Sequence, residues 1–268
     1  MNPQYRKPPI TEAILDLRVE PRPGASAAEL LAGLASLEEA FPVRREIRFE
    51  PEFATRAGGA INGFSLTVGN LLETAALGGF RYESADGRRI VQARHNGFVF
   101  SFVGTEAERY PGWEAFRAEA HSLWETYTEA WRPVAVVRAA LRYVNQFPVD
   151  FAIPETTGVH PGDYLSAFTV PRPDLLTNLM VGDLDLRVTL PQPDIEATAI
   201  VNNALAPAAT VPTGTGIMLL DIDIFQQRRI QPESDELWEQ LETLRTRKNQ
   251  LFRAWITQSV ENTLEPIQ

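Results

Sequence analysis

Hydrophobic and polar positions along the chain follow two periods, one typical of strands and the other typical of helices. From Thr11 to Val19 apolar and polar residues alternate, which predicts a strand with one buried face. A turn containing proline and glycine follows. Ser26 and Glu29 then have the spacing of a capping box, in which each side chain binds a backbone N–H of the other at a helix start. The chain therefore opens with a strand and a helix.

The clearest local pattern covers residues 79–103. Asp86-Gly87 and Asn96-Gly97 both suit the positive φ angles of tight hairpin turns, and apolar runs flank each of them. This pattern predicts a three-stranded antiparallel meander. Residues 111–131 follow, with aromatic side chains at spacings of three and four, which predicts an amphipathic helix.

A second cycle of elements begins at Pro133. We expect a long strand over residues 134–147, a short helix over residues 161–168 and a long closing helix from Ser234 to Leu264. Further strands and one long loop are predicted between them: strands at Asp183–Leu190, Asp194–Val201 and Gly216–Gln226, and the loop at Asn203–Thr215. The closing helix carries the basic run Arg245, Arg247 and Lys248, which we interpret as a solvated face that interrupts its apolar stripe.

The order strand, helix, several antiparallel strands and long helix thus occurs twice. It predicts an α+β fold made of two tandem units, 1–132 and 133–268, that pack as one body. Two arrangements share this order. One is the helix-grip fold, in which a curved sheet wraps a long C-terminal helix, and the other is the two-fold saddle of TATA-binding-protein-like folds. Both place helices on one face of an antiparallel sheet.

Composition narrows the classes of function. The 268 residues include 25 basic and 35 acidic side chains, for a formal net charge of −10, and no cysteine. The absence of cysteine excludes a disulfide framework, a thiolate zinc site and a cysteine nucleophile. Nucleic acid is a disfavoured partner, because an acidic chain repels phosphate. No signal peptide or membrane-spanning stretch is recognisable, so we expect a cytoplasmic protein with no membrane contact.

Five short segments stand out as motifs: Lys7-Pro8-Pro9-Ile10-Thr11-Glu12-Ala13, Tyr110-Pro111-Gly112-Trp113, Arg138 with Leu141-Arg142-Tyr143-Val144-Asn145, Leu220-Asp221-Ile222-Asp223, and Arg247-Lys248-Asn249 with Phe252. Together they resemble a sporadically distributed family of uncharacterised bacterial proteins that share a PPI-x-EA opening. The resemblance spans most of the chain. It implies an accessory gene product, including defence or toxin–antitoxin roles, and it implies no established activity.

Paired aspartates on two predicted strands are the main candidates for metal binding. Asp183 and Asp185 share one face of their strand, and Asp221 and Asp223 share one face of another. If the two strands lay adjacent, four carboxylates could converge, and they would need Mg²⁺ or arginine partners to offset their repulsion. The simpler interpretation is that all four face solvent.

Two arginines interrupt the otherwise apolar strand that opens the second half. They share one face, while a tyrosine and an asparagine occupy the opposite face. The candidate ligand- or partner-binding residues are therefore Arg138, Arg142, Tyr143 and Asn145. The guanidiniums could receive an anion or an acidic partner. The structural alternative pairs them with Glu12 or Asp16 of the first strand.

No complete catalytic set is recognisable in the sequence. It has no Gly-x-Ser-x-Gly elbow, phosphate-binding loop or dinucleotide fingerprint, and its three histidines lack metal-ligand spacing. The leading hypothesis is a non-catalytic binding protein, with no cofactor, for another protein or for a small ligand held between sheet and long helix. The alternative is an enzyme that acts on phosphate esters with Mg²⁺ held by the paired aspartates.

Overall fold

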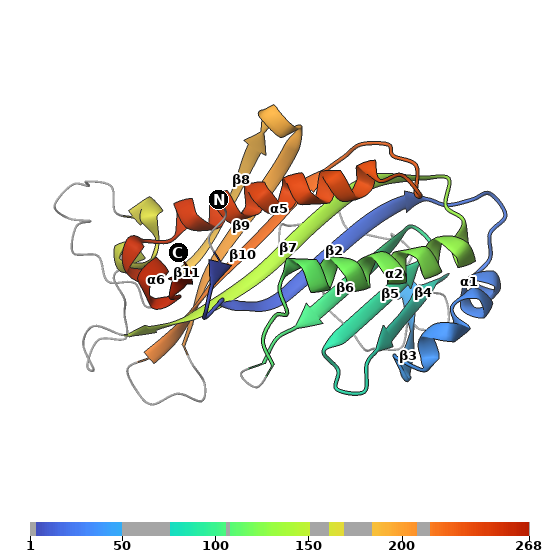
Figure 1. Cartoon of the computed structure of the whole chain (residues 1–268), viewed down its shortest axis with the longest axis horizontal. Coiled ribbons are helices and arrows are strands. Elements are labelled where there is room, and N and C mark those ends of the chain that lie inside the picture. The colour runs from blue at the N-terminus through green and yellow to red at the C-terminus, as the bar shows by residue number, and fades with distance from the viewer. Residues whose placement is uncertain are drawn as a thin grey trace, which may run out of the picture.

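The computed structural model describes residues 4–49, 76–105, 108–150, 161–168, 184–207 and 215–267. The strands are β1 (Gln4–Tyr5), β2 (Ile10–Glu20), β3 (Val43–Phe49), β4 (Ala76–Glu83), β5 (Arg89–Arg94), β6 (Gly97–Val103), β7 (Ala135–Asp150), β8 (Leu184–Gln192), β9 (Ala197–Pro207), β10 (Thr215–Gln226) and β11 (Pro266–Ile267). The helices are α1 (Ala27–Gly33), α2 (Trp113–Trp131), α3 (Pro161–Tyr164), α5 (Glu236–Trp255) and α6 (Gln258–Thr263). The described residues form an α+β fold, which confirms the predicted class (Figure 1).

Nine of the described strands form one antiparallel sheet, in the order β3-β4-β5-β6-β2-β7-β10-β9-β8. Within this sheet, the first strand of each half of the chain lies beside the last strand of that half, because β2 pairs with β6 and β7 pairs with β10. The two first strands, β2 and β7, pair with each other at the centre of the sheet. The short strands β1 and β11 form a separate pair that joins the two ends of the chain.

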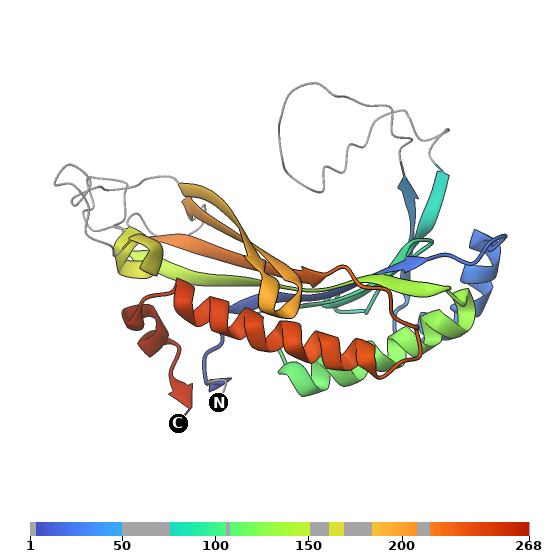
Figure 2. The ribbon, with the colours of Figure 1, turned by 90° about the horizontal axis from the view of Figure 1, so that it is seen from above.

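The long helices α2 and α5 lie on the same face of the sheet (Figure 2). No described helix covers the opposite, open face. The alternation on β2 separates the two faces as the sequence predicts. Ala13, Leu15 and Leu17 are fully buried toward the helices, whereas Glu12 and Asp16 belong to the open face. None of the helices in the described segments has the length and apolar character needed to cross a bilayer.

Buried apolar side chains form two clusters along the sheet. The first packs α1, α2 and the first half of α5 against the sheet, and it contains Trp124, whose Nε1 donates to the carbonyl oxygen of Pro232 at 3.0 Å. The second packs the last half of α5 against β7, β9 and β10, and it contains Phe252. The boundary between the clusters crosses the middle of β7, since Tyr143 belongs to the first and Phe147 to the second.

The closing helix is shorter than the sequence predicts. α5 ends at Trp255, and Ile256 is extended and forms an isolated bridge with Leu165. Thr257 then caps the separate helix α6, because its side chain accepts a hydrogen bond from the backbone N–H of Val260. A capping threonine therefore divides a stretch whose apolar spacing alone suggested one helix.

The loop predicted at Asn203–Thr215 is wrong at both ends. β9 continues to Pro207 and β10 begins at Thr215, and the residues between them lie outside the described ranges. Asn203 is fully buried in β9, where its Oδ1 accepts a hydrogen bond from Nε1 of Trp255 at 2.9 Å. A tertiary partner on α5 thus binds the side-chain oxygen of the residue at which local polarity predicted the strand to end.

Candidate functional site

Arg142 and Asp221 form a bidentate ion pair on the open face of the sheet. Nε and Nη2 of Arg142 donate to the two carboxylate oxygens of Asp221, each at 2.8 Å. Nδ2 of Asn202 adds a hydrogen bond of 3.0 Å to Oδ2. Asp221 is only 3% exposed, so its own chain satisfies a buried carboxylate and fixes its orientation.

Arg138 is held by two carboxylates on the same face. Its guanidinium lies 3.6 Å from Asp16 and 3.5 Å from Asp223, and it stacks 4.4 Å from the ring centroid of Phe225. Burial raises the pKa of Asp223, and the neighbouring guanidiniums oppose that rise. Both arginines therefore have partners within the chain. Arg138 contacts Asp16, as the structural alternative expects, whereas the ion-pair partner of Arg142 is Asp221 on β10. Their role in recognition stays a prediction.

The aspartates considered as metal ligands do not lie on adjacent strands. β9 separates β8 from β10, and the register across β9 aligns Asp185 with neither Asp221 nor Asp223. Asp183 lies outside the described residues. Within the described ranges, no three His, Cys, Asp or Glu side chains form a group that could hold a metal ion. The Mg²⁺ hypothesis required the two strands to be adjacent, and this condition is not met.

Tyr143 and Asn145 lie on the helix-covered face, where they line a pocket of about 420 Å³. The pocket lies between β7 and the last half of α5. Its other walls come from the segment that leads into β2 and from the loop before α2. Nδ2 of Asn145 donates to the carbonyl oxygens of Tyr143 and Leu220, at 3.3 and 3.0 Å, which holds this amide in the pocket wall. The structure thus brings together two of the four predicted binding residues in one cavity.

Gly112 shapes the wall formed by the start of α2. It is the N-cap residue and has a φ of 93°, a value that glycine adopts readily and that strains other residues. Trp113 follows as the first helical residue, and its Nε1 donates to a carboxylate oxygen of Glu242 on α5. This hydrogen bond ties the two long helices together at the rim of the pocket.

Most of the charge around the pocket is already paired. The charged lining residues are Glu114, Arg245, Lys248 and Arg253. Arg245 pairs with Glu242 at 2.5 Å, and Arg253 pairs with Glu261 at 3.0 Å. Glu114 is exposed at the rim. Of the positively charged residues in the lining, this leaves Lys248 without a carboxylate partner among the described residues.

Lys248 is a buried amine that has no carboxylate within ion-pair distance among the described residues. Its side chain comes from α5 and is 7% exposed, and Nζ lies 3.7 Å from the ring centroid of Tyr143. Burial, and to a lesser extent the nearby charge of Arg245, lowers the pKa of Lys248 to about 7. The amine therefore exchanges between its charged and neutral forms near neutral pH.

The prediction of a solvated basic run on this helix is wrong for Lys248. The residue follows Leu241 and Leu244 at the three-and-four spacing of the buried stripe, so its side chain enters the space beneath the helix. Arg247, one position earlier, instead pairs with Asp194 beside β9. Helical geometry, rather than charge, decides which face each of these residues joins.

Two tyrosine hydroxyls add hydrogen-bonding capacity to the same pocket. The oxygens of Tyr110 and Tyr143 lie 3.1 Å apart, and their rings meet edge to face. Burial raises the pKa of Tyr143 to about 12 and also raises the pKa of Tyr110, so both hydroxyls are protonated at neutral pH. One hydroxyl donates to the other, and no acceptor among the described residues takes the remaining hydrogen.

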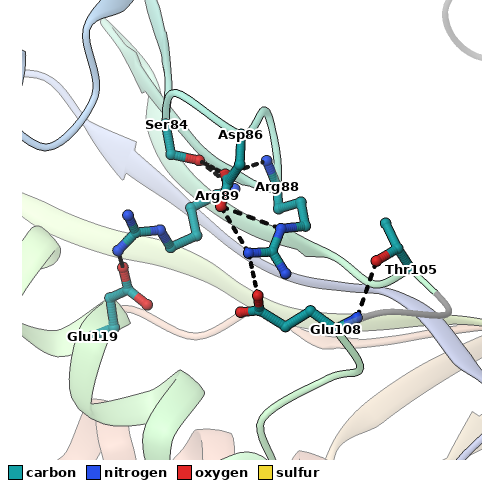
Figure 3. Close-up of polar contacts among 7 residues, drawn as sticks. All are labelled: Ser84, Asp86, Arg88, Arg89, Thr105, Glu108 and Glu119. Carbon is teal, nitrogen blue, oxygen red and sulfur yellow. Dashed lines mark hydrogen bonds and ion pairs between the residues drawn. The ribbon is translucent and has the colours of Figure 1, made fainter.

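A second polar cluster, at the turn between β4 and β5, is internally paired (Figure 3). Asp86 Oδ1 accepts hydrogen bonds from the Ser84 hydroxyl at 2.5 Å and from the backbone N–H of Arg88 at 3.0 Å. The Arg88 guanidinium binds Asp86 Oδ2 at 2.7 Å and also contacts Glu108. Every charged member of this group has a partner, so the cluster is explained as a hairpin turn stabilised by its own side chains.

Replacing Asp86 with asparagine should weaken folding in a pH-dependent way. The hydrogen bonds from Ser84 and Arg88 hold the pKa of Asp86 well below its usual range. A depressed folded-state pKa contributes stability above the unfolded value of about 3.9, and that contribution is lost as the pH falls. Urea unfolding should show Asp86→Asn less stable than wild type at pH 7, with the gap narrowing at pH 3. An equal gap at both pH values would contradict this account.

Four of the five segments that carry the family resemblance meet at the pocket beneath α5. The residues of these segments that line the pocket are Pro8, Pro9, Ile10, Tyr110, Pro111, Gly112, Trp113, Tyr143, Asn145, Lys248, Asn249 and Phe252. These residues are recognisable in the sequence as parts of motifs, but no local pattern indicates that they line one cavity. No protein-family model, curated protein or solved structure matches this chain.

Proposed function

We propose that the chain is a non-catalytic binding protein, and that its pocket beneath α5 receives a small ligand with a negatively charged group. The observation that carries this proposal is Lys248, a buried amine that lines the pocket and has no carboxylate partner among the described residues. A buried cation without a counter-charge destabilises a fold. An incoming anion would supply that counter-charge, and N–H groups of Arg245 and Arg253 that also line the pocket would donate to it.

The rest of the lining favours a ligand with a flat apolar body. Aromatic rings come from three sides of the pocket. They are Tyr110 in the loop before α2, Trp113 at the start of α2, Tyr143 on the sheet and Phe252 on α5. Such surfaces bind apolar groups, while a few placed polar groups orient them. An aromatic or otherwise apolar acid therefore matches the cavity better than a small hydrated ion.

For the fold, we propose the TATA-binding-protein-like saddle of two tandem units, 1–132 and 133–268, rather than a helix grip. Within the nine-stranded sheet, the first strand of each half pairs with the last strand of that half, and a long helix follows on the same face (Figure 2). A helix grip would need only one such helix. In this arrangement the pocket lies where the units meet, between the start of α2 and the second half of α5. A small-ligand role is therefore supported by a cavity that both units build.

The alternative, a metal-assisted enzyme acting on phosphate esters, has less support. Both carboxylate oxygens of Asp221 are occupied by Arg142 and Asn202, and Asp223 faces Arg138. A metal ion would have to displace these partners. The predicted cytoplasmic location and the association with accessory or defence genes rest on the sequence alone and stay predictions.

Thermal unfolding in the presence of aromatic anions tests the binding proposal. Phenyl phosphate and benzoate are the probes, and benzyl alcohol is the uncharged control. Both anions should raise the Tm of the wild-type protein, because a ligand that binds only the folded state stabilises it by mass action. The rise should be lost in Lys248→Met. It should be kept in the matched variant Lys7→Met, since Lys7 is exposed and pairs with Glu265.

Two outcomes would count against this function. Equal Tm shifts in wild type and Lys248→Met, or no shift with either anion, would contradict an anion-binding pocket at Lys248. A Tm rise with Mg²⁺ that Asp221→Asn abolishes would favour the metal-assisted alternative instead.

A further inference from the structure

Lysine is rare in this chain, and its two occurrences differ in their surroundings. Of the 25 basic residues, 23 are arginines, and the lysines are Lys7 and Lys248. Lys7 is exposed and forms an ion pair with Glu265. Lys248 is buried in the pocket without such a pair. Arginine would supply a positive charge equally well, but its guanidinium keeps its proton in proteins, whereas an amine can lose it.

We propose that Lys248 captures its ligand covalently, and that the ligand is a small aldehyde or ketone that also carries a carboxylate or phosphate group. The inference rests on the proposed binding function and names the ligand class for that pocket. The geometry supports this inference, because a buried amine that has no carboxylate partner among the described residues lines a cavity of about 420 Å³.

The pocket keeps this amine in a reactive state. Desolvation beneath α5 and the charge of Arg245 both disfavour the ammonium form, and this is a recognised way to activate a lysine nucleophile. The other charged groups of the lining are Glu114 at the rim and Arg253, which is bound to Glu261. Neither forms an ion pair with the amine. At neutral pH a substantial fraction of Lys248 is therefore neutral and carries a free electron pair.

The covalent step is an imine condensation that needs no oxidant or reductant. The electron pair of Nζ forms a bond to the carbonyl carbon, and the carbonyl oxygen takes up a proton to give a carbinolamine. The C–O bond then breaks, the hydroxyl leaves as water with a second proton, and a C=N bond remains. Nitrogen gives up its two protons in these steps, which balances the two protons taken up by the departing water. Amine plus carbonyl thus gives imine plus water.

Two features of the lining suit this step. The hydroxyl pair of Tyr110 and Tyr143 has one hydrogen free to donate toward the carbonyl oxygen, and the Tyr143 ring lies directly beneath Nζ. Arg245 and Arg253 also line the cavity, and each guanidinium has N–H donors beyond its glutamate pair that would bind the ligand's carboxylate or phosphate. The guanidinium N–H donors account for the anionic group, and the interior amine accounts for the carbonyl.

Reductive trapping tests the proposal on the intact protein. Wild-type protein is incubated near pH 7 with para-carboxybenzaldehyde or para-formylphenyl phosphate and cyanoborohydride, which reduces an imine to a stable secondary amine. Peptide mass spectrometry then compares Lys248 with Lys7 and the N-terminal amine in the same molecule. We expect modification at Lys248 to be faster than at Lys7 by about tenfold or more, because only Lys248 is desolvated.

Control compounds and variants separate the two parts of the recognition. Benzaldehyde lacks the anion and should label Lys248 more slowly than either anionic aldehyde. Lys248→Arg keeps the charge and Lys248→Met keeps the volume, and both should lose the selective labelling. Comparison of the carboxylate and phosphate aldehydes shows which anionic group the pocket prefers.

The outcomes also separate this inference from the binding function. If phenyl phosphate stabilises the protein through Lys248 but neither aldehyde labels Lys248 faster than Lys7, the covalent inference is overturned and the binding function stands. If neither stabilisation nor selective labelling depends on Lys248, both proposals fail. Selective labelling that para-hydroxymethylbenzoate suppresses by competition would support both.

Discussion

Replacing Lys248 with methionine is expected to stabilise the folded protein while abolishing its binding of aromatic anions. Methionine has a similar length and needs no counter-charge, so it can fill the space beneath α5 against Tyr143 and Phe252. Removal of a buried group that serves a ligand rather than the fold typically raises stability at the expense of function. A single substitution with these two opposite effects would be difficult to explain if Lys248 were structural.

The stabilisation should depend on pH in a defined direction. The pKa of Lys248 falls from 10.5 to about 7 on folding, so between these values the unfolded chain binds more protons than the folded one. Wild-type stability therefore rises with pH across this window, and the full cost of the buried charge is present below about pH 7. Lys248→Met lacks this dependence. Its advantage over wild type should be on the order of 3 kcal/mol at pH 6 and should shrink towards pH 10.

Urea unfolding at a series of pH values measures this effect, with Lys7→Met as the control. The control should track wild type at every pH, because Lys7 is exposed and its pair with Glu265 lies at the surface. Lys248→Met that is less stable than wild type at pH 6 would show that the amine has a stabilising partner, and the proposed role would then be wrong.

Replacing Arg142 with methionine should destabilise the protein by about 2–3 kcal/mol. The change leaves the buried carboxylate of Asp221 with only the hydrogen bond from Asn202. Removing one partner of a fully buried pair costs about 3–5 kcal/mol. The expected value is lower because the Arg142 side chain is 43% exposed, so water can reach part of the site.

A double-mutant cycle gives this prediction a matched control. Adding Asp221→Leu to Arg142→Met removes the unpaired charge and should restore stability to within about 1 kcal/mol of wild type. Arg187→Met, on the same face but exposed on β8, should change stability by less than about 0.5 kcal/mol. A folded Arg142→Met with native stability that fails to bind a partner would instead support the recognition role predicted from the sequence.

Periodicity in the sequence was sufficient to predict most of the secondary structure. The alternation from Thr11 to Val19, the capping box at Ser26 and the hairpin turns at Asp86-Gly87 and Asn96-Gly97 all correspond to described elements. These signals are local, since each depends on neighbours within a few residues. One error arose where a distant partner decides the outcome. Asn203 continues β9 because Trp255 binds it, and this partner lies 52 positions away.

The pocket could be anticipated only in part. Tyr143 and Asn145 were candidates because of their strand face, and both line it. Lys248 was assigned to solvent because of its charge, although its spacing from Leu241 and Leu244 already placed it on the buried stripe. No sequence pattern indicates that residues 8–10, 110–113 and 248–252 converge, because their proximity follows from the central pairing of β2 with β7 and from the path of α5.

The most direct test of the central claim observes the Lys248 amine itself. Protein labelled with carbon-13 at the lysine ε position should give only two lysine signals, since the chain has two lysines. The signal that disappears in Lys248→Met should titrate with a midpoint near pH 7, and phenyl phosphate should move that midpoint upward by stabilising the ammonium form. A Lys248 signal that keeps one charge state from about pH 5 to about pH 9 and ignores phenyl phosphate would contradict the account.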